Sequence, residues 1–533
     1  MAQTPDGSGK SPVVITKGST SVTSGVAVVQ KLVSAATAFG NVLRGTFGPN
    51  GLDKMHYKTN GETAVTNDGA KIIAELMVKH PAAKAFVSLA ESQENACGDG
   101  VTGCIILASE LMSEAGRLLE RSLHPLTLVK GYQMALDITM QTLEKRSKTL
   151  DENLIEVSRT ALVGRSTEGA LDHLAQLIAD AVDFIPDSDY QRVRMAKYGH
   201  GNASDSKLIK GVVLEKRIAS DRMPRKLSGI KCATLTCPLE IEKTTRDAEI
   251  EINSPEQLTA FIDAEEAQIN SKAQIIISSG ARAIFCTENI DKRILHALAE
   301  AGIYAIGNLE SDIIEGISKA TSSELSDHLD DINTESLGQI ESLTHRRHEG
   351  DDDVIERLII EAGDNSGIAT ILVGGTDGFV VEETIRGLFD ALRSACLAKE
   401  EDSIVLGGGS LHMAASMAIR EEAETCGGRE RLAMEAFSRA LESIPVSLAA
   451  NTGADKIDTL LELRSLHRKG KLNAGIDHSG APANIEGVWL PSFTLVHAIS
   501  AACESACSLL RVDQVISAPV SYTHLTLPTK RIV

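Results

Sequence analysis

Helical patterning at both ends of this chain, divided by a long segment of a different texture, limits the folds that the chain can adopt. From Val26 to Leu143 apolar residues recur at helical spacing, and the same texture returns after about Asp402. The segment from about Gly211 to Gly374 instead alternates short apolar runs with amphipathic stretches, which is typical of an α/β domain. We therefore predict a discontinuous helical domain built from both ends of the chain, with the middle inserted as further domains.

The middle segment contains one βαβ unit that can be predicted in detail. Ala283–Cys286 is predicted to be a buried strand, Ile290–Ala301 an amphipathic helix, and Ile303–Ile306 the next strand. The polar stretch from Ser322 to Asp353 is predicted to form loops on a solvated face, and we do not expect a metal site in it.

A second helix is predicted to begin after Ser254. This serine is a suitable N-cap, the next residue is a proline, and a glutamine stands at the third helical position. The helix is predicted to run through Gln268 and carries the apolar residues Leu258, Phe261 and Ile262. Such a stripe is either a core face or the surface of a projecting helix that binds a partner, and both remain open.

Length and composition exclude several classes of protein. A chain of 533 residues is expected to form about three domains. No apolar run approaches the roughly 20 residues of a membrane span, and the polar first twenty residues lack a signal-peptide core. The net charge of -20 argues against nucleic-acid binding. The nine scattered cysteines form no C-x-x-C motif, so we expect no structural zinc and a reducing, cytoplasmic compartment.

Four short glycine-rich clusters, three of them with aspartate, predict a binding site for a nucleotide. They occupy residues 48–55, 66–70, 98–103 and 407–409. Glycines let backbone N–H groups approach a phosphate closely, and aspartates can hold a divalent cation that the phosphates share. Because the clusters lie so far apart in sequence, we predict one site assembled from both ends of the chain.

The cluster around Asp99 gives the strongest of these signals. It precedes a predicted helix, Cys104–Leu118, and a glycine-rich turn at a helix N-terminus is a natural anion site. Phosphate would repel Asp99 unless a cation lay between them, which favours Mg²⁺. The chain has no P-loop motif. Alone, the Gly48 cluster could be a plain turn and Asp390 an exposed helix residue.

The motifs occur in the order found in group II chaperonins, of the archaeal thermosome and eukaryotic cytosolic kind, which this chain resembles from about residue 20 to 516. Several stretches look closer to the archaeal members, so the chain resembles a divergent archaeal-type subunit. The matching stretches are GPNGLDKM (48–55), TNDGA (66–70), HPAAK (80–84), GDGVT (98–102), RTALVGRS (159–166), RMPRKL (222–227), FDAL (389–392), LGGG (406–409), NTG (451–453), GID (475–477) and LLRVDQVI (509–516).

The resemblance implies the multidomain chaperonin fold. Subunits of this family, identical or paralogous, form two stacked rings that enclose non-native polypeptide clients, and ATP hydrolysis closes a built-in lid. The expected domains are a mainly α-helical, discontinuous equatorial domain (1–146 and 402–519), a small α/β intermediate domain (147–217 and 369–401), and an α/β apical domain (218–368) whose helical protrusion at about 240–275 forms the lid. Residues 520–533 match no family tail, and we expect them to be non-native.

The resemblance also implies roles for individual residues. Asp68 and Asp390 match the two acids that position and activate the attacking water. Arg165 stands where the family usually has a lysine that senses the γ-phosphate, and Asp99 matches the Mg²⁺ ligand. The expected nucleotide-binding residues are Thr46, Phe47, Gly48, Pro49, Asp99, Gly100, Val101, Thr102, Gly103, Arg165, Gly408 and Gly475.

Five positions depart from the family pattern. Val101 and Gly103 replace hydroxyl residues, Leu490 replaces an acid near the ribose, and Ala450 and His412 replace glutamates. Each lost hydrogen bond to a charged phosphate is worth about 1.5–3 kcal/mol. We therefore predict slow or weak-affinity ATP turnover. The alternatives are a mainly structural subunit of a mixed ring and a peptide-binding module that acts without a cage.

Overall fold

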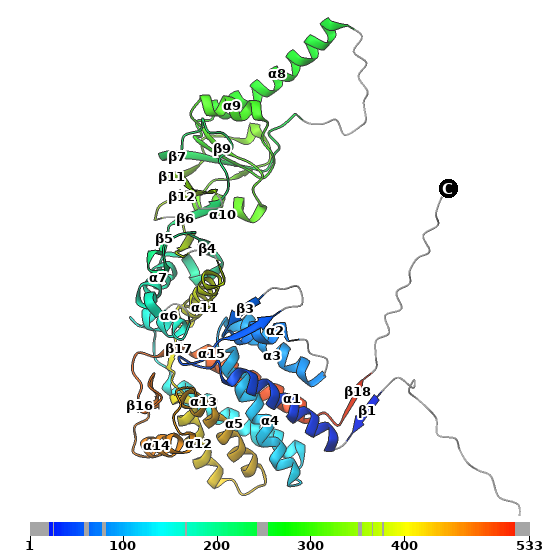
Figure 1. Ribbon diagram of the computed structural model, residues 1–533, viewed down its shortest axis with the longest axis vertical. Coiled ribbons are helices and arrows are strands. Elements are labelled where there is room, and N and C mark those ends of the chain that lie inside the picture. The colour runs from blue at the N-terminus through cyan, green and yellow to red at the C-terminus, as the bar shows by residue number, and fades with distance from the viewer. Residues whose placement is uncertain are drawn as a thin grey trace, which may run out of the picture.

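Three bodies, each with its own hydrophobic core, follow one another in an elongated molecule (Figure 1). The computed structural model describes residues 21–24, 26–57, 63–76, 81–165, 168–241, 254–349, 354–364, 366–375 and 378–517. The predicted non-native tail, 520–533, and residues 242–253 of the predicted protrusion lie outside the described residues.

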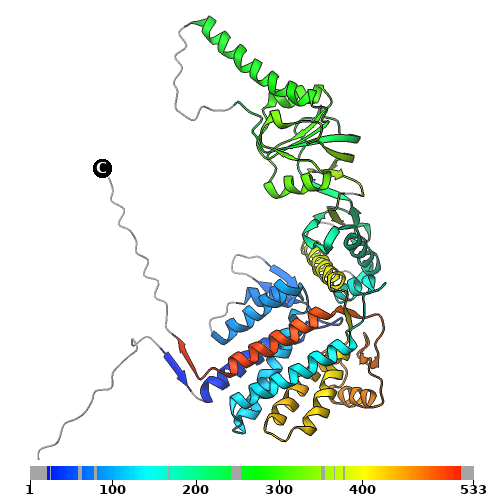
Figure 2. The same cartoon turned by 180° about the vertical axis from the view of Figure 1, so that it is seen from behind.

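The first body is a helical bundle built from both ends of the chain. Its central helix α4 packs against α1, α13 and α15, and Figure 2 shows α15 running beside the N-terminal helices. The helices are α1 (Val26–Arg44), α2 (Gly69–Glu75), α3 (Pro81–Cys97), α4 (Val101–Glu120), α5 (Pro125–Arg146), α12 (Ser410–Thr425), α13 (Glu430–Asn451), α14 (Lys456–Arg468) and α15 (Ser492–Leu510).

Short antiparallel strand pairs border this bundle. β1 (Ser21–Ser24) pairs with β18 (Gln514–Ser517), so the first and last described segments lie side by side. The other pairs are β2 (Lys54–Tyr57) with β3 (Thr63–Thr66), β14 (Ile404–Leu406) with β17 (Trp489–Pro491), and β15 (Ala474–Ile476) with β16 (Pro482–Asn484).

Helix α15 is long and apolar enough to span a membrane by composition alone. Its residues Leu495, Ile499, Ala502 and Ala506 are nevertheless buried, and α15 packs against α3, α4 and α5. Burial within the bundle therefore accounts for its apolar character.

The second body is smaller and mixes helices with a three-stranded sheet. β13 lies between β4, to which it is parallel, and β5, to which it is antiparallel. Helix α11 packs against α6 and α7. The elements are α6 (Leu154–Leu162), α7 (Leu171–Phe184), β4 (Val193–Lys197), β5 (Lys207–Ile209), β13 (Ala369–Val373) and α11 (Phe379–Glu401).

The third body is a seven-stranded sheet with flanking helices. The strand order is β6-β12-β11-β7-β8-β9, with β10 also paired to β7. The predicted βαβ unit is confirmed, because β8 and β9 are parallel neighbours joined by α9. The elements are β6 (Gly211–Glu215), β7 (Lys226–Leu235), α8 (Pro255–Ser278), β8 (Ala283–Cys286), α9 (Lys292–Glu300), β9 (Tyr304–Ile306), α10 (Ser311–Thr321), β10 (Leu325–Ser326), β11 (Gly338–Glu349) and β12 (Val354–Glu361).

The prediction of loops between Ser322 and Asp353 is wrong. Most of the second half of that stretch is the long strand β11, which pairs with β12 on one side and β7 on the other. Ile340 and Leu343 on this strand are fully buried, and His345 is 4% exposed. The buried positions change parity between Ile340 and Leu343, and the other side chains are mostly polar, so the sequence shows no regular two-residue alternation.

Helix α8 begins as predicted but runs well beyond Gln268. The Ser254 hydroxyl accepts a hydrogen bond from the Gln257 N–H at 3.3 Å and caps the helix. The first half of α8 projects away from the sheet (Figure 1), and Leu258, Phe261 and Ile262 are each almost half exposed. Of the two interpretations of this stripe, the structure therefore shows the projecting helix and not the core face.

Candidate functional site

The four glycine-rich clusters meet at one cavity of about 650 Å³. The helical bundle supplies most of its wall, and the second body contributes residues 159–165, at the end of α6, and Asp390 on α11. Among the residues predicted to be catalytic or to bind the nucleotide, all but one line this cavity: Thr46, Phe47, Gly48, Pro49, Asp68, Asp99, Gly100, Val101, Thr102, Gly103, Arg165, Asp390 and Gly408.

Gly475 is the exception, because it lies behind the wall. The N–H of Ile476 donates to the Gly408 carbonyl at 2.8 Å, and a Cβ on Gly475 would lie 2.6 Å from that same oxygen. Gly475 therefore lets β15 pack closely against the glycine triplet and supports the cavity from outside.

Two long helices direct their N-termini at the cavity without a side-chain cap. α4 begins after Gly100 and α12 after Gly409, and both glycines have left-handed backbones, with φ of 83° and 73°. The Ser410 N–H donates to the Gly407 carbonyl at 3.1 Å. No side chain caps either helix, so the other N–H groups of the first turns and the positive ends of both helix dipoles are available to an anion.

Four carboxylates gather beside these helix ends. Asp68 caps α2 by accepting from the Ala70 N–H at 2.9 Å, and Asp99 accepts from the Gly100 N–H at 2.6 Å. Glu94 extends from α3, and Asp390, on α11, is only 6% exposed. Asp390 is thus a cavity residue and not an exposed helix aspartate.

Burial and mutual repulsion raise the pKa values of this group. Burial, reinforced by Asp68 and Asp99, raises the pKa of Asp390 to about 8 despite the opposing effect of Arg165. Burial and Asp68 likewise raise the pKa of Glu94 to about 7, and burial raises the pKa of Asp99. At neutral pH burial and repulsion therefore favour a proton on Asp390 and on Glu94.

Arg165 is the cation closest to this group. Its Nη1 lies 2.7 Å from Oδ2 of Asp390, but it is not aligned for a hydrogen bond and has no hydrogen-bond partner. Burial alone would lower the pKa of Arg165, whereas Asp390 and Asp99 raise it, so the guanidinium stays charged. The hydroxyl of Thr494, also in the wall, is buried without a partner. A polar ligand could therefore bond the Thr494 hydroxyl and compete with Asp390 for the Arg165 guanidinium.

The residues present fit a nucleotide with Mg²⁺. Magnesium is held by one or two carboxylates together with phosphate oxygens and water, and does not need a cage made of protein alone. In the part of the chain that the structure describes, no group of three or more ligands is preassembled for a metal. A cation that arrives with the phosphates would favour the ionised form of these carboxylates.

The departures from the family pattern lie mostly in the cavity wall. Val101 is 4% exposed and turns an apolar side chain to the site, and Leu490 does the same at another point of the wall. A Cβ on Gly103 would lie 3.4 Å from the Phe47 ring. His412 is buried, which lowers its pKa to about 4, so it is neutral and leaves the site without a carboxylate there.

Two site residues were missed by sequence reasoning, Glu94 and Thr494. Glu94 lies one turn before the Gly98 cluster, and this helical spacing was a usable signal. Thr494 lies in the first turn of α15 and offered no signal of its own.

Most of the chain matches a known protein family. A family model described as the TCP-1/cpn60 chaperonin family matches residues 39–519. Thermosome subunit alpha of Archaeoglobus fulgidus is 37% identical over 521 residues, which is 95% of each chain. A thermosome subunit of Methanopyrus kandleri is 36% identical and covers 91% of each chain, and thermosome subunit alpha of Thermoplasma acidophilum is 33% identical and covers 96% of each.

Proposed function

The chain belongs to the TCP-1/cpn60 chaperonin family as a group II chaperonin subunit, and from this premise we propose that it is an ATP-driven folding chaperone. In this proposal identical or paralogous subunits form a double ring that encloses non-native protein, and hydrolysis of ATP closes a lid. The observation that carries the proposal is the cavity in which two uncapped helix N-termini face four carboxylates.

The three bodies correspond, in this proposal, to the domains of such a subunit. The helical bundle is the equatorial domain, the small mixed body the intermediate domain, and the seven-stranded body the apical domain. The projecting half of α8 belongs to the lid in this proposal, because its apolar residues Leu258, Phe261 and Ile262 are almost half exposed.

The reaction is hydrolysis of ATP to ADP and phosphate. The N–H groups at the starts of α4 and α12 would bind the phosphate oxygens. Asp99 would hold Mg²⁺, which neutralises phosphate charge when it is bound. Asp68 and Asp390 orient the attacking water, and Asp390 accepts its proton, for which a raised pKa is suitable.

Arg165 couples this chemistry to the second body. Its guanidinium lies beside Asp390, and Arg165 follows directly after the end of α6 in the chain. A phosphate in the cavity would compete with Asp390 for the guanidinium, so the position of the second body would depend on the state of the nucleotide.

A weakly hydrolysing, mainly structural subunit of a mixed ring is the second candidate function. It is favoured by one observation, the apolar lining at Val101 and Leu490, which reduces the number of hydrogen bonds available to the nucleotide. The two candidate functions differ in the rate of ATP hydrolysis per subunit, whereas both predict that the protein assembles into rings.

One pair of variants tests the proposal. Asp390→Asn should lower ATP hydrolysis by about a hundredfold or more and leave ATP binding in place, since the amide cannot accept the proton. The matched control is Asp183→Asn, which removes an exposed ion pair with Lys399 at the other face of α11. Electron microscopy with and without ATP reports ring formation and closure for each protein. Hydrolysis unchanged in Asp390→Asn would refute the catalytic assignment, and absence of rings would refute the assembly.

A further inference from the structure

A second cavity, of about 340 Å³, shares the carboxylate cluster with the candidate nucleotide site. Asp68, Glu94 and Asp390 line both cavities, and the rest of the second cavity comes from α2, α3 and α11. None of those other residues lines the first cavity. The two cavities are therefore adjacent and meet at these three residues.

The second cavity runs from the surface to these carboxylates. Ala74, Glu91 and Asn95 on its wall are exposed, whereas Ala90 is 2% and Asp390 6% exposed. A small solute that enters at the exposed end thus reaches Asp390 without passing through the nucleotide cavity.

The chemistry of hydrolysis requires a path on this side. Water must attack the γ-phosphorus on the side opposite the departing ADP, so it stands between the phosphate and the carboxylates. The P–O bond to ADP breaks as the new P–O bond forms, and the inorganic phosphate is released next to Asp68 and Asp390. With ADP still in the first cavity, the way past these residues leads the phosphate into the second cavity.

We propose that the second cavity is the exit route for inorganic phosphate, and the entry route for water, while ADP remains bound. This inference rests on the proposed ATPase function and adds to it the order of product release. It predicts that phosphate leaves before ADP.

The charges that line the second cavity would let a phosphate ion pass without binding it tightly. Lys71 and Arg386 line the cavity and attract a phosphate dianion. Arg386 is also engaged by Glu383, through a short contact, and its Nη1 lies 3.5 Å from the Thr66 hydroxyl. Because Glu383 pairs with Arg386, and the carboxyl groups of Asp68, Glu91, Glu94 and Asp390 also line the cavity, the phosphate is not retained.

Ala74→Trp tests the route, because Ala74 is exposed and lines the second cavity alone. The indole should obstruct the exit without touching the nucleotide. The matched control is Ser88→Trp on α3, an exposed position that lines neither cavity. ATP cleavage is followed by rapid chemical quench, and free phosphate by a fluorescent phosphate-binding protein, in the same assembled preparation.

In Ala74→Trp, free phosphate should appear at least about fivefold later than cleavage, so the quench shows a burst of enzyme-bound phosphate. In the Ser88→Trp control, the rates of cleavage and of phosphate release should both lie within about twofold of the parent values. If Ala74→Trp does not assemble, Ala74→Leu serves in its place with a smaller delay.

Release that keeps pace with cleavage in the Ala74 variants would overturn the route and leave the ATPase function intact. Absence of cleavage in the parent would instead overturn the ATPase function, and the route with it. The two failures are therefore distinguishable in one experiment.

Discussion

Glu442 on α13 bonds side chains of α12 and α14, and its replacement should lower the local stability of these helices strongly. Its side chain is 3% exposed and accepts hydrogen bonds from Ser416 and Arg420 on α12 and from Arg464 on α14. In Glu442→Gln one oxygen remains as an acceptor. The other acceptor, which receives Arg420 Nη2 at 3.1 Å and Arg464 Nη2 at 2.5 Å, becomes an NH2 group that faces two cations.

The expected cost follows from these two lost bonds. Hydrogen bonds to charged groups are worth about 1.5–3 kcal/mol each, and breaking a buried pair costs about 3–5 kcal/mol. Arg420 and Arg464 are 29% and 25% exposed, so water recovers part of the loss. We expect the local unfolding free energy of α13 and α14 to fall by about 3 kcal/mol.

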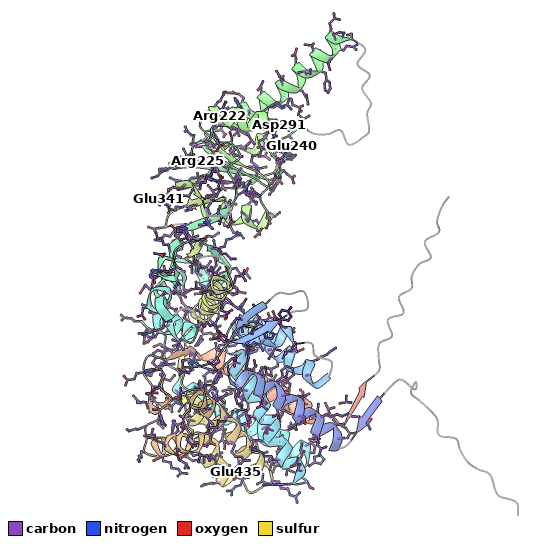
Figure 3. The ribbon with its side chains drawn as sticks, in the orientation of Figure 1. Arg222, Arg225, Glu240, Asp291, Glu341 and Glu435 are labelled. Carbon is purple, nitrogen blue, oxygen red and sulfur yellow. The ribbon has the colours of Figure 1, made fainter. Side chains whose placement is uncertain are left out.

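Amide hydrogen exchange measures this change locally. A loss of about 3 kcal/mol corresponds to exchange roughly a hundredfold faster in residues 430–451 and 456–468. The matched control is Glu435→Gln on the same helix (Figure 3), whose ion pair with Arg431 is exposed and should matter by less than about 0.5 kcal/mol. Equal effects of the two substitutions would refute the argument from burial.

Three further predictions concern the other bodies and the site. Gly48→Ala should weaken ATP binding about tenfold by calorimetry, because a left-handed backbone (φ 83°) costs other residues about 1–2 kcal/mol and the new Cβ would lie 2.3 Å from Leu448. Burial lowers the pKa of His345 below 6.5, so the unfolded chain takes up this proton first and stability is lost as the pH falls through 6.5. The lowered pKa of Glu356 adds to this loss of stability only at more acidic pH. His345→Gln should therefore reduce the change of melting temperature with pH between pH 7.5 and 5.5, and an unchanged slope would contradict this. Phe261→Ser should reduce the capture of a non-native protein, measured by suppression of its aggregation, and leave ATP hydrolysis unaltered.

Local features of the fold could be predicted from the sequence because their signals span only a few residues. The cap at Ser254 and the strand Ala283–Cys286 depend on neighbours in the chain, and the structure places both where they were predicted. The strand β11 was missed because its buried apolar residues, Ile340 and Leu343, do not fit one two-residue alternation, and because the burial of His345 depends on Tyr304 and Glu356 from other strands.

The candidate site divides in the same way. The glycine clusters could be recognised in sequence because a close phosphate approach demands glycine, and the structure brings them together. What the sequence could not predict is how many carboxylates share the space. Asp390 alone resembles any exposed helix residue, and Glu94 joins it only because α3 and α11 lie side by side.

The bundle built from both ends of the chain has a consequence for synthesis. Its core contains residues up to Ala135 and then none until Ala415, which is 280 residues later. At about 5–20 residues per second a ribosome needs roughly 14–56 s to make that interval. During this time α1, α3, α4 and α5 have been made, but the apolar faces that pack against α12, α13 and α15 in the folded bundle are still uncovered. A nascent chain of this protein thus exposes, for most of its synthesis, the kind of surface that an unfolded-protein binder recognises.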